Sequence, residues 1–134
     1  MGLAARAVAE LIGRPLELPD TLVARWPELA HARWRAGGLP PRLGGWMLGI
    51  RSVAGITLWR TIFLAADTAL DPALLLHELR HVQQFHDSPA FPLLYLWESV
   101  TRGYHRNRFE ADARQYAEAR LRGVEPPVFT LSNA

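Results

Sequence analysis

The chain has 134 residues, 49% hydrophobic and 21% charged, which suits one domain with a single buried core and is too short for two. Cysteine is absent, so disulfides and thiolate metal sites are excluded. Fifteen basic residues, all arginine, against thirteen acidic ones leave a net charge of +2. Because the arginines are scattered, we expect no nucleic-acid partner. The sequence therefore predicts a single domain over residues 1–134.

The sequence predicts neither a membrane-spanning helix nor a secretory signal. No run approaches the ~18 consecutive apolar residues of a membrane helix, and the longest one, Phe91–Trp97, stops at Glu98. The opening "MGLAARAVAELIGRP" is interrupted by Glu10 and lacks a good cleavage site, which favours a short amphipathic helix over a secretory signal. We therefore expect a cytoplasmic protein with no membrane partner.

The first half of the chain mixes helical and strand patterns. Apolar residues at helical spacing predict a helix over residues 3–12 and a second over Leu22–Leu29, capped by Asp20 or Thr21. Glycine, proline, tryptophan and β-branched residues then dominate, with turns expected at "GGLPP" and "LGG". The strands expected are Ala32–Arg35, Trp46–Gly49, Gly55–Leu58 and Arg60–Ala65. For the last two, the alternation is equally consistent with a single strand over Gly55–Leu64.

The second half is helical. Asp71 followed by Pro72 predicts the start of a helix that runs to Asp87. A further helix is expected from residue 91 or 92 to about 102, and a last one, "RFEADARQYAEARLR", between Asn107 and Gly123. Residues from about 124 to 134 read as an extended tail. Helix, small mixed or antiparallel sheet and three helices together predict an α+β domain.

The motif "HELRH" lies on the first of these three helices. His77 and His81 are one turn apart on one face, so both imidazoles can bind a single zinc ion at ~2.0–2.1 Å. Glu78 lies about 100° round the helix, where it can take a proton from zinc-bound water. Leucines flank the motif, so its polar groups are expected to be buried and to need partners. This HExxH pattern predicts a Zn²⁺ site with Glu78 as the general base.

A catalytic zinc needs a third protein ligand. His86 is on the same helix but turned about 140° from the second histidine, so it is excluded. Glu110, Asp112 and His105 remain. We favour Glu110, because small alanines around it allow the last helix to pack closely on the motif helix. Its rival role is a capping box with Asn107.

The strand-like "ITLWRTIFLA" followed by the capped "HELRH" helix resembles the zincin metallopeptidases, and more narrowly a small gluzincin of the minigluzincin type. The resemblance covers about residues 55–120, and "HELRH" is its one highly specific motif. It implies a small sheet packed on the motif helix, an edge strand that holds the substrate, and a later glutamate, here Glu110, as third zinc ligand. The family has an aspartate four residues after this glutamate, and the corresponding residue here is Arg114. Asp112 or a main-chain carbonyl is left to orient a ligand histidine.

Further polar residues of the second half are candidates for the site. A hydrolase of this kind needs a donor for the oxyanion, and Tyr104 and His105 are the main candidates, with Tyr95 and Tyr116 left open. The remaining polar residues of the motif helix are expected to serve packing or to face solvent. These residues are Arg80, Gln83 and Gln84.

Three functions are compatible with these patterns. The first is a zinc metallopeptidase acting on a peptide or protein substrate. The second is a zincin-fold module that binds zinc or peptide without turnover, and the third is a protein whose arginines contact an anionic partner. Glu78 favours the first, because a purely structural metal site has no use for a carboxylate there.

Overall fold

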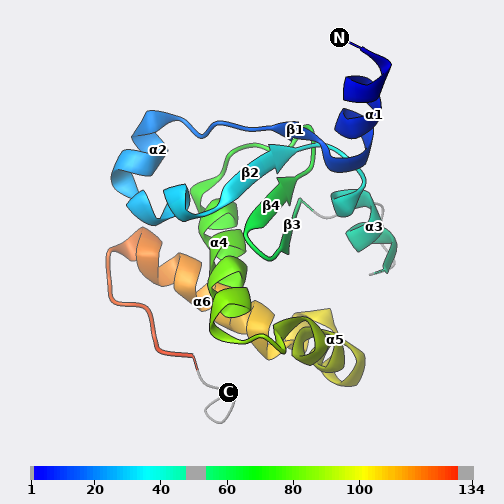
Figure 1. Ribbon diagram of the computed structural model, residues 1–134. Coiled ribbons are helices and arrows are strands. Elements are labelled where there is room, and N and C mark those ends of the chain that lie inside the picture. Colours follow the sequence, from blue (N-terminus) through cyan, green and yellow to red (C-terminus); the bar gives the residue numbers. More distant parts are fainter. Residues whose placement is uncertain (1, 48–53, 130–134) are drawn as a thin grey trace. The chain divides into compact units, whose positions relative to one another are not determined.

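The computed structural model describes residues 2–47 and 54–129, with the backbone alone for 44–47. Within these residues the fold is α+β, as predicted, with six α-helices and a four-stranded mixed sheet. The chain forms two compact units, Met1–Leu70 and Asp71–Ala134 (Figure 1). That both belong to one zincin-like domain stays a prediction.

The first unit holds the sheet. Its helices are α1 (Leu3–Ile12), α2 (Asp20–Arg25), the 3-10 helix η1 (Pro27–His31) and α3 (Pro40–Met47). Its strands are β1 (Arg14–Pro15), β2 (Arg33–Ala36), β3 (Gly55–Leu58) and β4 (Thr61–Leu64). The strand order is β1-β2-β4-β3, with β2 and β4 parallel and the two outer pairs antiparallel.

The centre of the sheet is well buried. Ile62 and Leu64 of β4 are at most 1% exposed, and the Trp34 indole of β2 donates a hydrogen bond to Leu29 O at 2.9 Å. Strands β3 and β4 form a hairpin that reverses at Trp59, whose φ is +55°. The predicted strands at 55–58 and 60–65 are thus confirmed to within a residue, and the alternative of one continuous strand is wrong.

Two predictions for the first unit need correction. Residues 46–47 of the predicted strand Trp46–Gly49 belong to α3, and 48–49 lie outside the described residues. The "LGG" turn is likewise helical, because the proline pair that begins at Pro40 supplies a helix start directly after the glycine turn.

The second helix and the first strand also differ from expectation. Helix α2 starts at Asp20, two residues early, and ends before Pro27, where the chain continues as a 3-10 helix. Strand β1 was not predicted, since two residues carry no periodicity. It depends on Gly13, where an added Cβ would lie 2.3 Å from Ala36 O.

The second unit consists of helices and an extended segment, and its predicted helices are confirmed. These are α4 (Pro72–Asp87), α5 (Phe91–Arg102), the 3-10 turn η2 (Tyr104–Arg106) and α6 (Arg108–Arg122), followed by extended residues 124–129. Asp71 caps α4 by accepting from Ala73 N–H at 3.3 Å, and Gly123 ends α6 in the left-handed conformation. No described helix is both long and apolar enough to cross a bilayer.

Helices α4 and α6 cross each other in close contact (Figure 1). The small side chains of Ala113 and Ala117 on α6 are buried, which permits a close approach between helices. Helix α5 joins them through aromatic contacts, with the Phe91 and Phe109 rings 4.9 Å apart. Three residues of the "HELRH" motif, His77, Arg80 and His81, contact side chains of α6.

Candidate metal centre

His77 and His81 lie on one face of α4, with ring centroids 5.0 Å apart. Both direct Nε2 at the carboxylate of Glu110 on α6. The distance from His77 Nε2 to Oε2 is 2.9 Å, and that from His81 Nε2 to Oε1 is 3.1 Å. One carboxylate thus contacts both imidazoles through separate oxygens, which is the convergence that the sequence predicts.

The orientation of Glu110 comes from its neighbours. The Tyr95 hydroxyl of α5 donates to Oε1 at 2.6 Å. Asn107 caps α6, accepting from the Phe109 and Glu110 amides at 2.9 and 3.4 Å, while its own N–H donates to Tyr104 O. The Glu110 carboxylate therefore faces the histidines, and the capping-box alternative is not adopted.

Glu78 is the second carboxylate of the cluster. It is 6% exposed, and its ligand atom and those of the two histidines all lie within 4.8 Å of one another. Glu110 contacts the two Nε2 atoms at 2.9 and 3.1 Å. The cluster thus holds two carboxylates, Glu110 from α6 and Glu78 from α4.

The far nitrogen of His81 is held by Gln84. Its Oε1 accepts a hydrogen bond from His81 Nδ1 at 2.7 Å. The Gln84 amide nitrogen donates to Phe109 O at 3.1 Å and to Asp112 Oδ2 at 2.8 Å, so the amide can present only its oxygen to the ring. Of the two roles expected for Gln84, helix packing is confirmed, because its side chain is 6% exposed and bonds two residues of α6, and exposure to solvent is wrong. Its bond to His81 was not predicted.

Asp112 does not reach the histidines as a ligand. Its carboxylate accepts from Arg80 Nε at 2.7 Å and from Gln84. Arg80 also donates to Gln83 Oε1 at 2.8 Å and lies over the Tyr116 ring. Asp112 and a main-chain carbonyl were the groups expected to orient a ligand histidine. Asp112 and the Phe109 carbonyl both hold Gln84, and Gln84 in turn bonds His81.

Without metal, the cluster places a cationic histidine against an anionic glutamate. Burial opposes charge on both partners, but the contacts with the two histidines hold the pKa of Glu110 well below its usual range. Burial likewise lowers the pKa of His81, yet hydrogen bonding and the charges of Glu110 and Glu78 outweigh it and raise this pKa to about 9. At neutral pH without metal, a proton on His81 therefore faces an ionised Glu110.

The candidate oxyanion donors fall in different places. Tyr104 is half-buried, and burial together with the charges of Glu110 and Glu78 raises its pKa to about 12, so its hydroxyl keeps its proton at neutral pH. His105 is exposed and packs on the Tyr104 ring, 5.5 Å between centroids. His86 is exposed near the end of α4. Of the candidate tyrosines, Tyr104 and Tyr95 both lie close enough to Glu110 and Glu78 for burial and these charges to raise the pKa of their hydroxyls.

The donor set fits a zinc ion. Two donors of a tetrahedral zinc at ~2.0–2.1 Å are ~3.3 Å apart, and the observed Nε2–carboxylate distances of 2.9 and 3.1 Å are only slightly shorter. Two imidazoles with carboxylates suit zinc and neighbouring transition metals better than magnesium or calcium, which prefer oxygen ligands.

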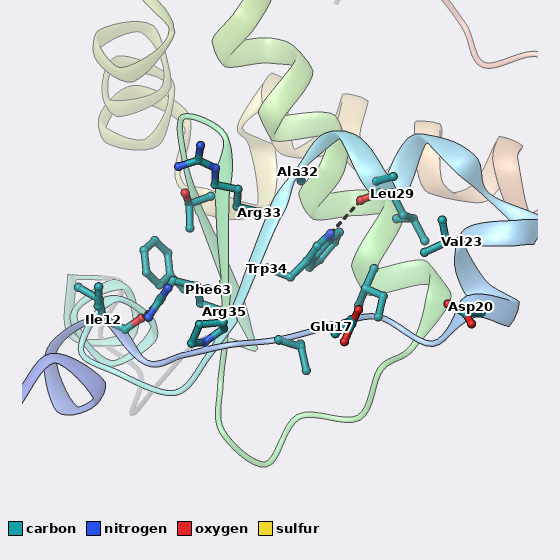
Figure 2. Close-up of a pocket in the computed structure, with 15 residues that line it drawn as sticks. Ile12, Glu17, Asp20, Val23, Leu29, Ala32, Arg33, Trp34, Arg35 and Phe63 are labelled. Atoms are coloured by element: carbon teal, nitrogen blue, oxygen red, sulfur yellow. Dashed lines mark hydrogen bonds between the residues drawn. The ribbon is translucent and has the colours of Figure 1, made fainter. Parts of the chain in front are cut away.

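The first unit contains a separate hollow of about 680 Å³ (Figure 2). Trp34 and Phe63 line it, as do Glu17 and Asp20, which are exposed. The Arg35 guanidinium at its wall is bonded to the Ile12 and Gly13 carbonyls at 2.7 and 2.9 Å. Among the described residues, the group that could hold a metal is in the second unit instead.

No protein family model, curated protein or solved structure matches the chain. The resemblance to zincin peptidases therefore stays a prediction that rests on the motif and its surroundings.

Proposed function

We propose that this protein is a zinc-dependent metallopeptidase in which His77, His81 and Glu110 hold the metal and Glu78 is the general base. The observation that carries the proposal is the meeting of both Nε2 atoms with one carboxylate of α6, with a second carboxylate beside them. The alternative of a zinc-binding module without turnover gives no role to that second carboxylate.

The charges of the cluster support a bound dication. Glu78 and Glu110 are both buried beside the two imidazoles, and the neighbouring carboxylate of Asp112 is paired with Arg80. At neutral pH without metal, a proton on His81 lies against Glu110. Bound zinc would replace that proton and would bring two positive charges next to both carboxylates.

Each side chain then has a distinct task. When bound, zinc supplies Lewis acidity and lowers the pKa of water toward ~7. Glu78 accepts a proton from the attacking water and passes it to the leaving amine of the peptide. Tyr104 keeps its proton at neutral pH and donates a hydrogen bond to the developing oxyanion. Gln84 fixes the ring of His81 so that Nε2 faces the site.

Glu78→Gln tests this proposal. The substitution keeps the size of the side chain and removes its basicity, so we expect unchanged zinc content and melting temperature. Hydrolysis of a mixed peptide library should fall by ~10²–10⁴-fold. Glu118→Gln, at an exposed glutamate of α6, is the matched control and should retain full activity.

Three results separate the alternatives. Wild-type protein that takes up no zinc after metal addition would refute the metal site. Hydrolysis that survives Glu78→Gln undiminished would refute the role of the base. Zinc uptake without any wild-type hydrolysis would identify the module without turnover.

A further inference from the structure

Arg114 lies one turn beyond Glu110 on α6. Residues four apart fall on the same side of a helix, about 40° apart round its axis, with their Cβ atoms about 5–6 Å from each other. The two side chains differ in burial, because Glu110 is 3% exposed and faces the histidines, whereas Arg114 is exposed. Arg114 therefore lies beside the candidate metal centre, on its solvent side.

The guanidinium of Arg114 is turned back toward the start of α6. Its Nη2 donates a hydrogen bond to His105 O at 3.1 Å. His105 directly follows Tyr104 in η2, so this bond brings the guanidinium past the helical turn that carries Glu110 and close to the turn that carries Tyr104. Helical side chains generally lean in this direction.

Electrostatic effects on Tyr104 agree with this placement. Burial and the charges of Glu110 and Glu78 raise the pKa of the Tyr104 hydroxyl, and the charge of Arg114 opposes them. The hydroxyl is therefore within electrostatic reach of the two carboxylates of the cluster and also of the guanidinium. An exposed arginine is common on a protein surface, but this one acts on the tyrosine that is proposed to contact the oxyanion.

Arg114 retains donors for a ligand. A guanidinium carries more N–H donors than one bond uses, and the bond to His105 O is the one that Arg114 makes within residues 2–47 and 54–129. It forms no ion pair in that part of the chain, because Glu110 faces the histidines and Glu118, one turn further on, pairs with Arg122. Such a guanidinium can hold a carboxylate through two parallel hydrogen bonds.

We propose that Arg114 is a specificity-determining residue that binds a carboxylate of the peptide substrate. The inference rests on the proposed peptidase function and names its substrate class, peptides with a carboxylate close to the cleaved bond. The two charges of a bound zinc ion offset those of Glu78 and Glu110, so Arg114 leaves the site positive. An extended peptide advances ~3.3–3.6 Å per residue. A carboxylate one or two residues from the cleaved bond therefore spans the distance of about 5–6 Å between Glu110 and Arg114.

The carboxylate can come from the C-terminus of a peptide or from an acidic side chain, and three fluorescent peptide pools distinguish these sources. One pool has a free C-terminus and no acidic residue, one is amidated with a central Asp or Glu, and one is amidated without either. Binding is measured by fluorescence anisotropy on zinc-loaded Glu78→Gln protein, which holds peptides without cleaving them. We expect at least one carboxylate pool to bind ~10-fold more tightly than the uncharged pool.

Substitutions of Arg114 test the contact. In the same assay, Arg114→Gln should abolish the preference and leave binding of the uncharged pool unchanged. Arg114→Lys keeps the charge but not the planar pair of donors, so it should retain part of the preference. Arg122→Gln removes an exposed arginine two turns further along α6 and is the matched control, which should retain all of it. Zinc content and circular dichroism confirm that each variant is loaded and folded.

Kinetics provide a second measurement. With Glu78 intact, Arg114→Gln should raise KM for a cleaved peptide of the preferred pool by ~10-fold and leave kcat nearly unchanged, because the ion pair is present in the bound substrate and in the transition state alike.

Three outcomes would overturn the proposal. They are equal binding of the three pools, a preference that survives Arg114→Gln, and a preference that Arg122→Gln abolishes as fully as Arg114→Gln does. The binding assay requires no turnover, so it separates this proposal from the proposed function. Zinc-loaded wild-type protein that prefers a carboxylate pool through Arg114 but cleaves no peptide would contradict the peptidase function and support the carboxylate contact.

Discussion

Gln84 Oε1 lies 2.7 Å from Nδ1 of His81, on the side of the ring away from Glu110. The glutamine is itself held by Phe109 O and by the carboxylate of Asp112. Because both of these partners accept hydrogen bonds, the amide cannot turn round without losing them. His81 is thus held with Nδ1–H toward Gln84 and with Nε2 toward the cluster.

Gln84→Ala should therefore weaken zinc binding by ~10–100-fold, the usual cost of losing a residue that orients a metal ligand. Gln83→Ala is the matched control, because Gln83 is adjacent on α4 but contacts Arg80 and Tyr116 instead. Zinc affinity is measured by competition with a coloured chelator, and melting of the metal-free proteins reports their folding. Equal affinities for Gln84→Ala and wild type would remove Gln84 from the site.

Glu110→Ala should reduce zinc affinity by more than the ~10–100-fold expected for Gln84, since Glu110 contacts both Nε2 atoms directly. The cap of α6 is retained, because Asn107 bonds the Glu110 amide and not its side chain. His86→Ala and His105→Ala remove exposed imidazoles and should leave affinity unchanged. Elemental analysis of the purified variants gives the result directly. Zinc retained by Glu110→Ala and lost by His105→Ala would reassign the third ligand.

The helices of the second unit were predictable because their ends are encoded locally. Asp71–Pro72, Asn107 and Gly123 cap their helices through contacts within a few residues, and the structure has each one in that role. The first unit was harder. Helix α3 includes Gly44 and Gly45, which favour a turn by propensity, so the strand predicted next to it was partly wrong. Strand β1 exists through pairing with a distant strand, which no local pattern reports.

The candidate site was likewise predictable where it depends on local sequence and not where it depends on contacts between helices. His77, Glu78 and His81 follow from spacing on one helix, and the approach of Glu110 follows from the small alanines of α6. Gln84 was not found, because its hydrogen bond to His81 depends on side chains of α6 that orient its amide. No sequence signal distinguishes Tyr95, which bonds Glu110, from Tyr116, which contacts Gln83. Which tyrosine reaches the site depends on distances between helices, which the sequence does not encode locally.

The stability of the metal-free protein should depend on pH through Glu98. Hydrogen bonding and charge from Arg108 hold the pKa of Glu98 below 4.5, although burial opposes this. A carboxylate with a lowered pKa stabilises the folded state above its unfolded pKa, and that contribution is lost as pH falls through the lowered folded value. Glu98→Gln should therefore reduce the denaturant midpoint at neutral pH, and the difference from wild type should vanish in acid.

Glu118→Gln is the control for this measurement. Glu118 pairs with Arg122 at the surface of α6, with 60% of its side chain exposed, so its loss should have little effect at any pH. A Glu98→Gln deficit that is as large in acid as at neutral pH would mean that lost packing, and not the ion pair, destabilises the variant.

Tyr104 is the donor expected to act on the substrate, and Tyr104→Phe tests it. Its hydroxyl is half-buried near Glu110 and Glu78 and keeps its proton at neutral pH, because its pKa is raised to about 12. Removing the hydroxyl should leave zinc content unchanged and lower kcat by ~10²–10³-fold, the usual cost of losing one oxyanion donor. KM should change little, because this interaction strengthens only in the transition state.

Tyr116→Phe is the matched control for Tyr104→Phe. The Tyr116 hydroxyl accepts from Gln83 at 3.4 Å, and its ring lies under Arg80, so kcat should be retained. His105→Ala should also retain kcat, because that imidazole is exposed. Steady-state kinetics on a single cleaved peptide, with each variant loaded with zinc, distinguishes the cases. A loss of kcat in His105→Ala with full activity in Tyr104→Phe would transfer the oxyanion contact from the tyrosine to the histidine, while the metal ligands would stay as assigned.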